Sequence, residues 1–81
     1  MIYRMEFNGG GFRPMVGTLD EVKNTFDELM YAIAGEVAPP ELVADLSEDG
    51  KICQCYELGK ARGVILFGYK NNPAKDFLEG A

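Results

Sequence analysis

Cys53 and Cys55 are the residues of this chain whose type and spacing come nearest to redox or metal chemistry. In an extended strand, residues at this spacing place their Cα atoms about 6.5–7 Å apart, at or beyond the limit for a disulfide. A zinc site needs four ligands, and the chain has no histidine to complete one. We therefore expect free, buried thiols, no metal, no cofactor and a reducing, cytoplasmic location. A small cysteine-dependent redox or metal protein is the least favoured alternative.

Two further patterns fall short of established ligand sites. Gly9–Gly11 matches neither GxxxxGK[ST] nor GxGxxG, and a flexible hairpin loop accounts for it. A calcium loop that began at Asp45 would need a bidentate glutamate at its twelfth position, where this chain has Tyr56. Neither pattern predicts a bound phosphate or cation.

Catalysis is not indicated by the composition. Ser47 is the only serine, and without histidine no neighbouring base would activate its hydroxyl as a nucleophile. The acidic residues fall mainly on one helix surface and in turns, where solvation keeps carboxyl pKa values ordinary. The sequence therefore predicts a protein that is not an enzyme.

The charge is distributed unevenly along the chain. Thirteen acidic and eight basic residues give a net charge of −5, and residues 18–50 alone carry nine acids and one base. Direct binding to nucleic acid is not expected, because useful affinity needs many phosphate contacts from lysine and arginine. The distribution instead predicts an acidic side, suited to a protein partner with a basic surface, and a mildly basic side.

The first strands and the helix must position these charges. We expect residues 1–81 to form one domain, because a chain of this length builds only one small core. Alternation predicts a half-buried strand over residues 1–8, and Phe12–Val16 is predicted to return beside it as an edge strand that tolerates Pro14. No apolar run approaches the roughly 20 residues of a membrane helix, so no membrane association is expected.

A long helix is predicted over roughly residues 19–34. Thr18 and Glu21 have the spacing of a capping box, and Gly35 is a natural stop after a stripe of apolar residues at helical spacing. The opposite arc of this helix places a tyrosine among acidic and amide side chains, which is typical of an interaction surface. We predict that this arc binds the partner through Asp20, Asn24, Asp27, Glu28 and Tyr31.

Antiparallel strands are predicted after the helix, although a short helix over residues 40–46 is an alternative. A primed turn at Asp49-Gly50 pairs Glu48 with Lys51, and the same register pairs Ala44 with Cys55 and Val43 with Tyr56. Alternation then divides the hairpin into two faces. The face that we expect beneath the helix contains Leu42, Ala44, Leu46, Cys53 and Cys55. A central strand over 64–70 and a short helix over 73–79 complete the chain.

These elements predict an α+β fold in which one long helix packs on a four- or five-stranded antiparallel sheet. The expected order is β-(β)-α-β-β-β with a possible short C-terminal helix. One helix covers one face of such a sheet, so the other face needs a cover, either the C-terminal tail, a second copy of the chain or a partner. We predict a possible second interface there, formed by Val43, Ile52 and Tyr56.

Together these features favour a small, acidic, non-enzymatic protein-binding module. We expect an inhibitor of the phage type, comparable in size and charge with anti-CRISPR proteins, that docks on a basic, nucleic-acid-binding surface of a partner protein. The alternative is a homodimeric structural or adaptor subunit that uses the open sheet face.

Overall fold

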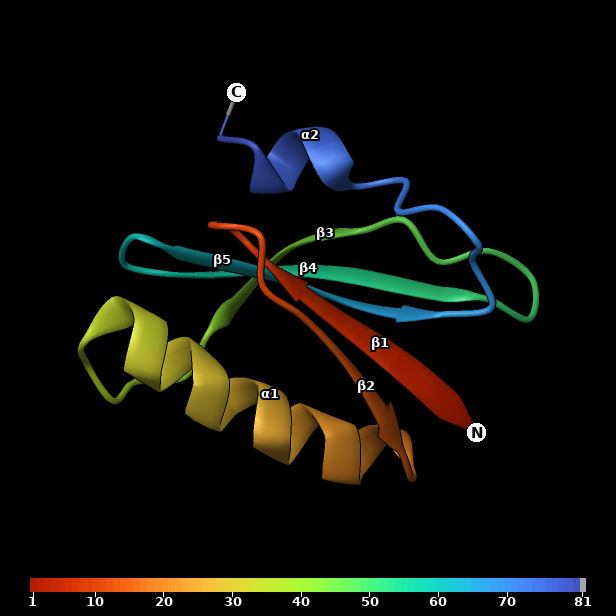
Figure 1. Cartoon of the computed structure of the whole chain (residues 1–81), viewed down its shortest axis with the longest axis horizontal. Helices are drawn as coiled ribbons and strands as arrows, with labels where there is room; N and C mark the ends of the chain where they lie inside the picture. Colours follow the sequence, from red (N-terminus) through yellow and green to blue (C-terminus); the bar gives the residue numbers. More distant parts are fainter. Residues whose placement is uncertain (81) are drawn as a thin grey trace.

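The chain folds around one antiparallel sheet. The computed structural model describes residues 1–80, and within them the elements follow the order ββαβββ with a short terminal helix (Figure 1). The strands lie side by side in the order β2-β1-β5-β4-β3. The predicted α+β fold is therefore confirmed. The elements are β1 (Ile2–Phe7), β2 (Phe12–Val16), α1 (Leu19–Ala34), β3 (Glu41–Asp45), β4 (Ile52–Leu58), β5 (Ala61–Phe67) and α2 (Lys75–Leu78).

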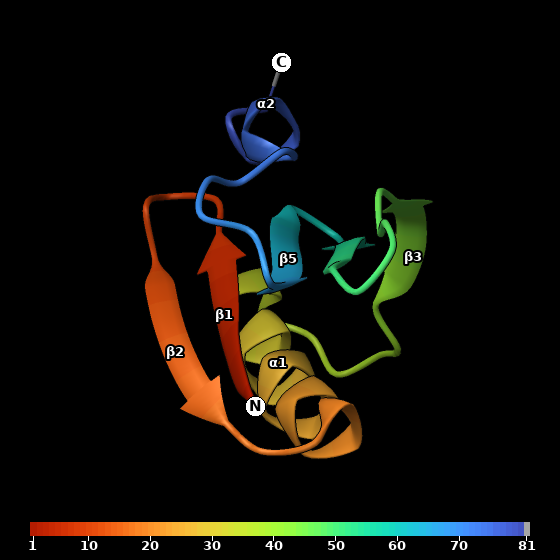
Figure 2. The same cartoon turned by 90° about the vertical axis from the view of Figure 1, so that its right-hand side faces the viewer.

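The two helices lie on opposite sides of the sheet. α1 packs mainly on β5, with β1 and β4 on either side of it, while α2 also contacts β5 (Figures 1 and 2). β5 is consequently covered on both faces, and Val64, Ile65 and Leu66 in succession are buried. A strand that is buried on both faces carries a continuous apolar run rather than an alternating one, as this segment does.

The start of α1 is stabilised by the predicted capping box. Thr18 Oγ1 accepts a hydrogen bond from the backbone N–H of Glu21 at 3.2 Å, and Glu21 Oε1 accepts one from the N–H of Thr18 at 2.9 Å. At the other end Gly35 adopts a φ of 76°, and its N–H donates to the carbonyl of Tyr31 at 2.8 Å. The predicted limits of the helix are thus correct, because local hydrogen bonds determine both ends.

Replacing Thr18 by alanine is expected to lower the free energy of unfolding by about 0.5–2 kcal/mol. The capping bonds hold the pKa of Glu21 below its ordinary value. Their contribution to the stability of the fold is therefore complete above the pKa that Glu21 has in the unfolded chain, and it is lost as the pH falls through the pKa that Glu21 has in the folded protein. Urea denaturation of wild type and variant at neutral and acidic pH measures both effects. Thr25→Ala, inside the same helix, is the control and should not reproduce this loss.

The core beneath α1 is aromatic. The Phe26 ring lies 5.3 Å, centroid to centroid, from the rings of both Phe7 and Tyr56. Gly63 of β5 faces the same space, and a Cβ atom there would lie only 2.6 Å from Cζ of Phe26. The absence of a side chain at this position lets the large ring sit directly on the sheet.

The predicted hairpin register is correct near the turn and wrong beyond Ala44. Glu48 bridges Lys51 and Ala44 pairs with Cys55, as expected, and residues 41–45 form a strand rather than the alternative helix. A bulge at Val43 then shifts the register by one residue. Tyr56 therefore pairs with Leu42, whereas the predicted register pairs Tyr56 with Val43. The extra residue transfers Leu42 to the other face of the sheet.

The assignment of the two faces of β4 was also wrong. Ile52 and Tyr56 lie on the α1 side, and Tyr56, only 8% exposed, belongs to the core that includes Phe26. Cys53 and Cys55 lie on the other side, in a smaller core with residues of β5 and α2. The aromatic ring fills the deep space under α1, whereas the small thiols suit the thin layer beneath the C-terminal segment.

The last two elements are shifted relative to their predicted limits. The turn before β5 contains only Gly59 and Lys60, because Leu58 pairs with Ala61, so the strand covers Ala61–Phe67 rather than 64–70. α2 is confirmed as a short helix, and it begins at Lys75 instead of residue 73. None of the helices within residues 1–80 combines the length and the apolarity needed to cross a membrane.

Candidate functional site

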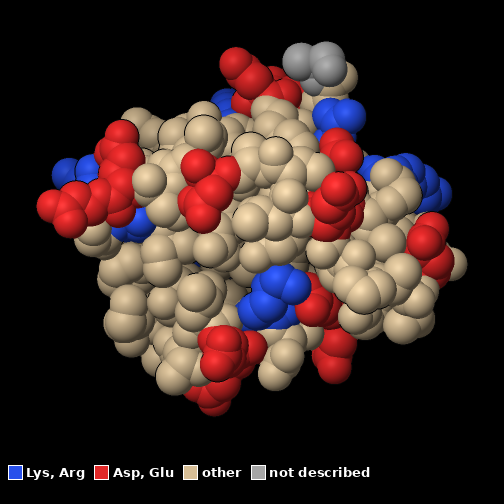
Figure 3. Space-filling view, turned by 180° about the vertical axis from the view of Figure 1, so that it is seen from behind, with Lys and Arg blue, Asp and Glu red and all other residues tan. Residues whose placement is uncertain are grey.

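The acidic segment of the chain occupies neighbouring parts of the fold. Residues 18–50 form α1, β3 and the turns that flank them. β3 is the outer strand at the edge of the sheet opposite β2, and α1 lies beneath the middle of the sheet (Figure 2). Viewed toward this edge, acidic side chains are scattered over the face, and a basic side chain lies near its middle (Figure 3).

The predicted partner-binding residues of α1 fall into two groups. Asp20, Asn24 and Glu28 are exposed, as the helical arrangement predicts. Asp27 and Tyr31 are half-buried, and Tyr31 packs against the edge of the main core. The structure brings all five onto one arc of the helix, and their role in binding stays a prediction.

Lys23 is a charged neighbour of these predicted residues. Its ammonium group lies 2.6 Å from Oδ1 of Asp27, four residues along α1, and 4.8 Å from the centroid of the Tyr56 ring. The charge of Asp27 is therefore partly compensated and its side chain is held against the sheet. The i,i+4 spacing was visible in the sequence, but the tyrosine beneath it was not.

Tyr56 marks the junction between α1 and β3. Its hydroxyl donates a hydrogen bond to Oε1 of Gln54 at 3.2 Å. Burial raises the pKa of this hydroxyl, and the nearby carboxylates of Asp27 and Asp45 raise it further. The carboxylate of Asp27 comes from α1 and is paired with Lys23, whereas the carboxylate of Asp45 comes from β3.

Exposed apolar side chains adjoin this junction. Leu42 and Val43 of β3 are both more than 40% exposed, and Leu42 pairs with Tyr56. We name as the α1–β3 surface the five predicted residues of α1 together with Leu42, Val43 and Asp45. Apolar atoms among carboxylates give a partner both contact area and charge recognition.

The three residues of the predicted second interface do not lie together on an open face of the sheet. Val43 is exposed at the sheet edge, while Ile52 is half-buried and Tyr56 is buried on the α1 side. Their predicted place on an open sheet face is therefore wrong. On the α2 side, the exposed apolar residues of β1 and β2 are Ile2, Phe12 and Val16, and Ile2 pairs with Val16 across these two strands.

The two cysteines are free and buried. Burial raises the pKa of Cys53 to about 12, and the neighbouring Cys55, whose own pKa burial also raises, adds to the effect. Because the thiolate is the reactive form, these thiols are poor nucleophiles at neutral pH. Among residues 1–80, no three cysteine or carboxylate side chains are grouped in a way that would hold a metal ion.

Thiol labelling is expected to be at least about a hundredfold slower in the native protein than in urea, because burial limits both access and ionisation. The measurement is the rate of reaction with an excess of a thiol reagent near pH 8. A small solvent-exposed thiol compound provides the reference rate. Equal rates in native and unfolded protein would show that the Cys53 and Cys55 layer opens readily, and would support the redox alternative.

No protein-family model, curated protein sequence or solved structure matches this chain, so its function has to be inferred from the surfaces described above.

Proposed function

We propose that the protein is a non-enzymatic protein-binding module that docks its α1–β3 surface onto a basic surface of another protein. The observation that carries this proposal is the set of exposed polar side chains Asp20, Asn24 and Glu28 on α1, with half-buried Tyr31 on the same arc and exposed Leu42 on β3. Complementary charge steers association, and the apolar atoms slow dissociation.

An inhibitor is the form of binding that we favour. A compact acidic surface competes well with a polyanion for a basic, nucleic-acid-binding surface, because the negative charge of each is attracted to that surface. Small phage-encoded inhibitors of the anti-CRISPR type are the class that this size and charge suggest. The free thiols of Cys53 and Cys55 suit the reducing cytoplasm.

The proposal is tested by binding measurements with two sets of variants. A partner is first isolated from a lysate of the native host with the wild-type chain, and its affinity is then measured at low and high salt. Asp20→Lys with Glu28→Lys is expected to slow association about tenfold at low salt, and Tyr31→Ala is expected to weaken binding by more than about 1 kcal/mol, mainly through faster dissociation.

The matched control is Asp76→Lys with Glu79→Lys. These residues lie in and next to α2, on the other side of the sheet, and their replacement changes the net charge by the same amount. If the control slows association as much as the α1 variant, the effect is one of net charge and the α1–β3 surface is not the interface. Salt-independent affinity, with all three variants binding like wild type, would also contradict the proposal.

A homodimer is the second candidate, and the structure changes the residues that it would use. Exposed Ile2 and Val16 pair across β1 and β2, and Phe12 lies on the same side of the sheet. Val16→Lys should then give a monomer in light scattering without unfolding. A wild type that is monomeric at millimolar concentration would exclude this candidate.

A further inference from the structure

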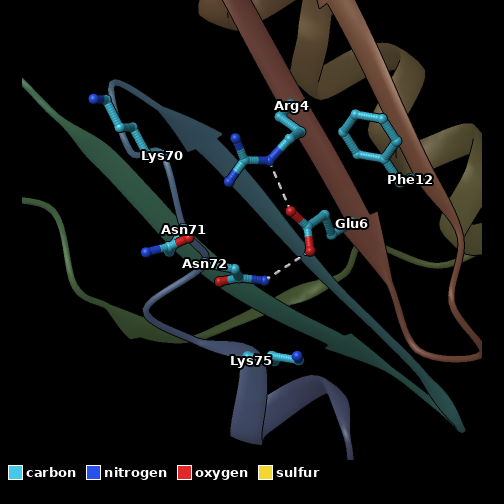
Figure 4. Close-up of a pocket in the computed structure, with 7 residues that line it drawn as sticks. All are labelled: Arg4, Glu6, Phe12, Lys70, Asn71, Asn72 and Lys75. Atoms are coloured by element: carbon cyan, nitrogen blue, oxygen red, sulfur yellow. Dashed lines mark hydrogen bonds and ion pairs between the residues drawn. The ribbon is translucent and has the colours of Figure 1, made fainter.

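We propose that the pocket between β1 and the segment after β5 binds a small phosphate-bearing ligand with a planar ring, of the nucleoside monophosphate class. The pocket lies on the α2 side of the sheet (Figure 4) and has a volume of about 490 Å³. Small-molecule sites generally have volumes of about 300–1,000 Å³. None of its lining residues belongs to the α1–β3 surface, so this inference is independent of the proposed function.

The floor of the pocket is a fixed polar network. Arg4 Nε lies 2.7 Å from Oε2 of Glu6, and Arg4 Nη1 donates to the carbonyl of Tyr69 at 3.0 Å. Asn72 Nδ2 donates to the other carboxylate oxygen of Glu6 at 3.1 Å. Two chain segments, β1 and the one after β5, thereby hold the guanidinium in one orientation, and both oxygens of the only carboxylate in the pocket are already engaged by the protein.

The charge of the pocket is positive although the chain is acidic. Arg4, Lys70 and Lys75 line it together with the single acid Glu6, which leaves a net charge of +2. Lys70 lies near the Arg4 end and Lys75 at the opposite end, with Glu6 and Asn72 between them (Figure 4). The ion pairs found among residues 1–80 include neither Lys70 nor Lys75. Both lysines are therefore available to a phosphate, which carries up to two negative charges at neutral pH.

Phe12 supplies the apolar wall. It belongs to β2, pairs with Glu6 of β1, and is 61% exposed although it is an aromatic residue. An exposed ring beside cationic groups can stack on a nucleobase, a contact that depends on the flat face and not on the base type. The arrangement thus provides one place for the anion and one for the planar ring.

A small ligand fits these observations better than a nucleic-acid strand. Binding to a strand depends on many phosphate contacts along an extended basic surface. Here three cations line one open pocket of limited size, and the chain as a whole has a net charge of −5. Long-range repulsion acts on a polyanion much more than on a mononucleotide whose charge is matched locally.

The test is a titration of the full chain with adenosine monophosphate and, separately, with inorganic phosphate, followed by amide chemical shifts. Shifts of residues around the pocket are expected to saturate with each probe. Lys70→Ala and Lys75→Ala should each weaken the binding of both probes roughly fivefold, because each removes one partly exposed charge contact. Phe12→Ala should weaken the mononucleotide at least about fivefold and leave phosphate binding unchanged.

Lys60→Ala is the matched control, because Lys60 is exposed in the turn before β5 and does not line the pocket. It should bind both probes like wild type. Equal losses of probe affinity in Lys60→Ala and in the pocket variants would show that the probes are attracted to the surface charge in general, and would overturn the proposal. Absence of saturable shifts at millimolar probe, or a single-stranded oligonucleotide that binds far more tightly than the mononucleotide, would also overturn it. Native spectra are expected for all four variants, since the replaced side chains are exposed.

Discussion

Replacing Phe26 by alanine is expected to remove about 3–5 kcal/mol of the free energy of unfolding. The side chain is fully buried, and its ring lies 5.3 Å from the rings of Phe7 and Tyr56. Truncation removes these contacts and leaves a cavity that the surrounding sheet cannot close. A domain of this size has a total stability of only about 4–12 kcal/mol, so the variant should be largely unfolded on mild heating, as followed by circular dichroism and urea denaturation.

Phe12→Ala is the matched control for this experiment. It makes the same chemical change in a ring that is 61% exposed on β2. A shift of less than about 0.5 kcal/mol is expected there. If the two variants had the same stability, Phe26 would not be the centre of the core and the packing of α1 on the sheet would need revision.

Gly63→Ala is expected to cost about 1–3 kcal/mol, although it adds only one methyl group. A Cβ atom at this position of β5 would lie 2.6 Å from Cζ of Phe26 and 2.9 Å from Sδ of Met30. The methionine can rotate, but the phenyl ring is held between Phe7 and Tyr56. The helix must therefore move away from the sheet, and the midpoint of urea denaturation should fall.

A double-mutant cycle separates this clash from other effects of losing a glycine. In the Phe26→Leu background, where the ring is absent, Gly63→Ala should cost clearly less than in wild type. Gly11→Ala is the control, because an added Cβ there meets Phe7 at an ordinary 3.7 Å. An identical cost of Gly63→Ala in both backgrounds would exclude the contact with Phe26 as its cause.

The elements governed by local interactions were predictable from the sequence. The limits of α1 follow from Thr18, Glu21 and Gly35, which make their hydrogen bonds within a few residues. The Glu48–Lys51 pairing follows in the same way from a two-residue turn. In both cases the information lies in residues next to one another, so neither depends on the rest of the fold.

The faces of β4 could not be assigned from alternation alone. Both sets of side chains are apolar, since α1 covers Ile52 and Tyr56 while the C-terminal segment covers Cys53 and Cys55. Alternation separates the two sets, but it carries no information on which helix covers which set. The bulge at Val43 was equally hidden, because it depends on the register with β4 and not on a glycine or proline in β3.

The two proposed binding surfaces were predictable to different degrees. The helix arc around Tyr31 could be predicted because helical spacing brings residues three and four apart together. The pocket around Arg4 and Lys75 was missed, because its residues are separated by almost the whole chain and meet only through the pairing of β1 with β5. No local pattern marks such a meeting.

The two ends of the strand order have a consequence for behaviour at high concentration. An outer strand with free backbone groups can recruit a strand from another molecule and so start a fibril. β2 carries Pro14, which has no N–H to offer an incoming strand, and β3 is interrupted by the bulge at Val43. Both routes for adding a sixth strand are thus obstructed by the backbone itself. The exposed leucine and valine side chains of β3 therefore lie on an edge strand that is a poor template for amyloid.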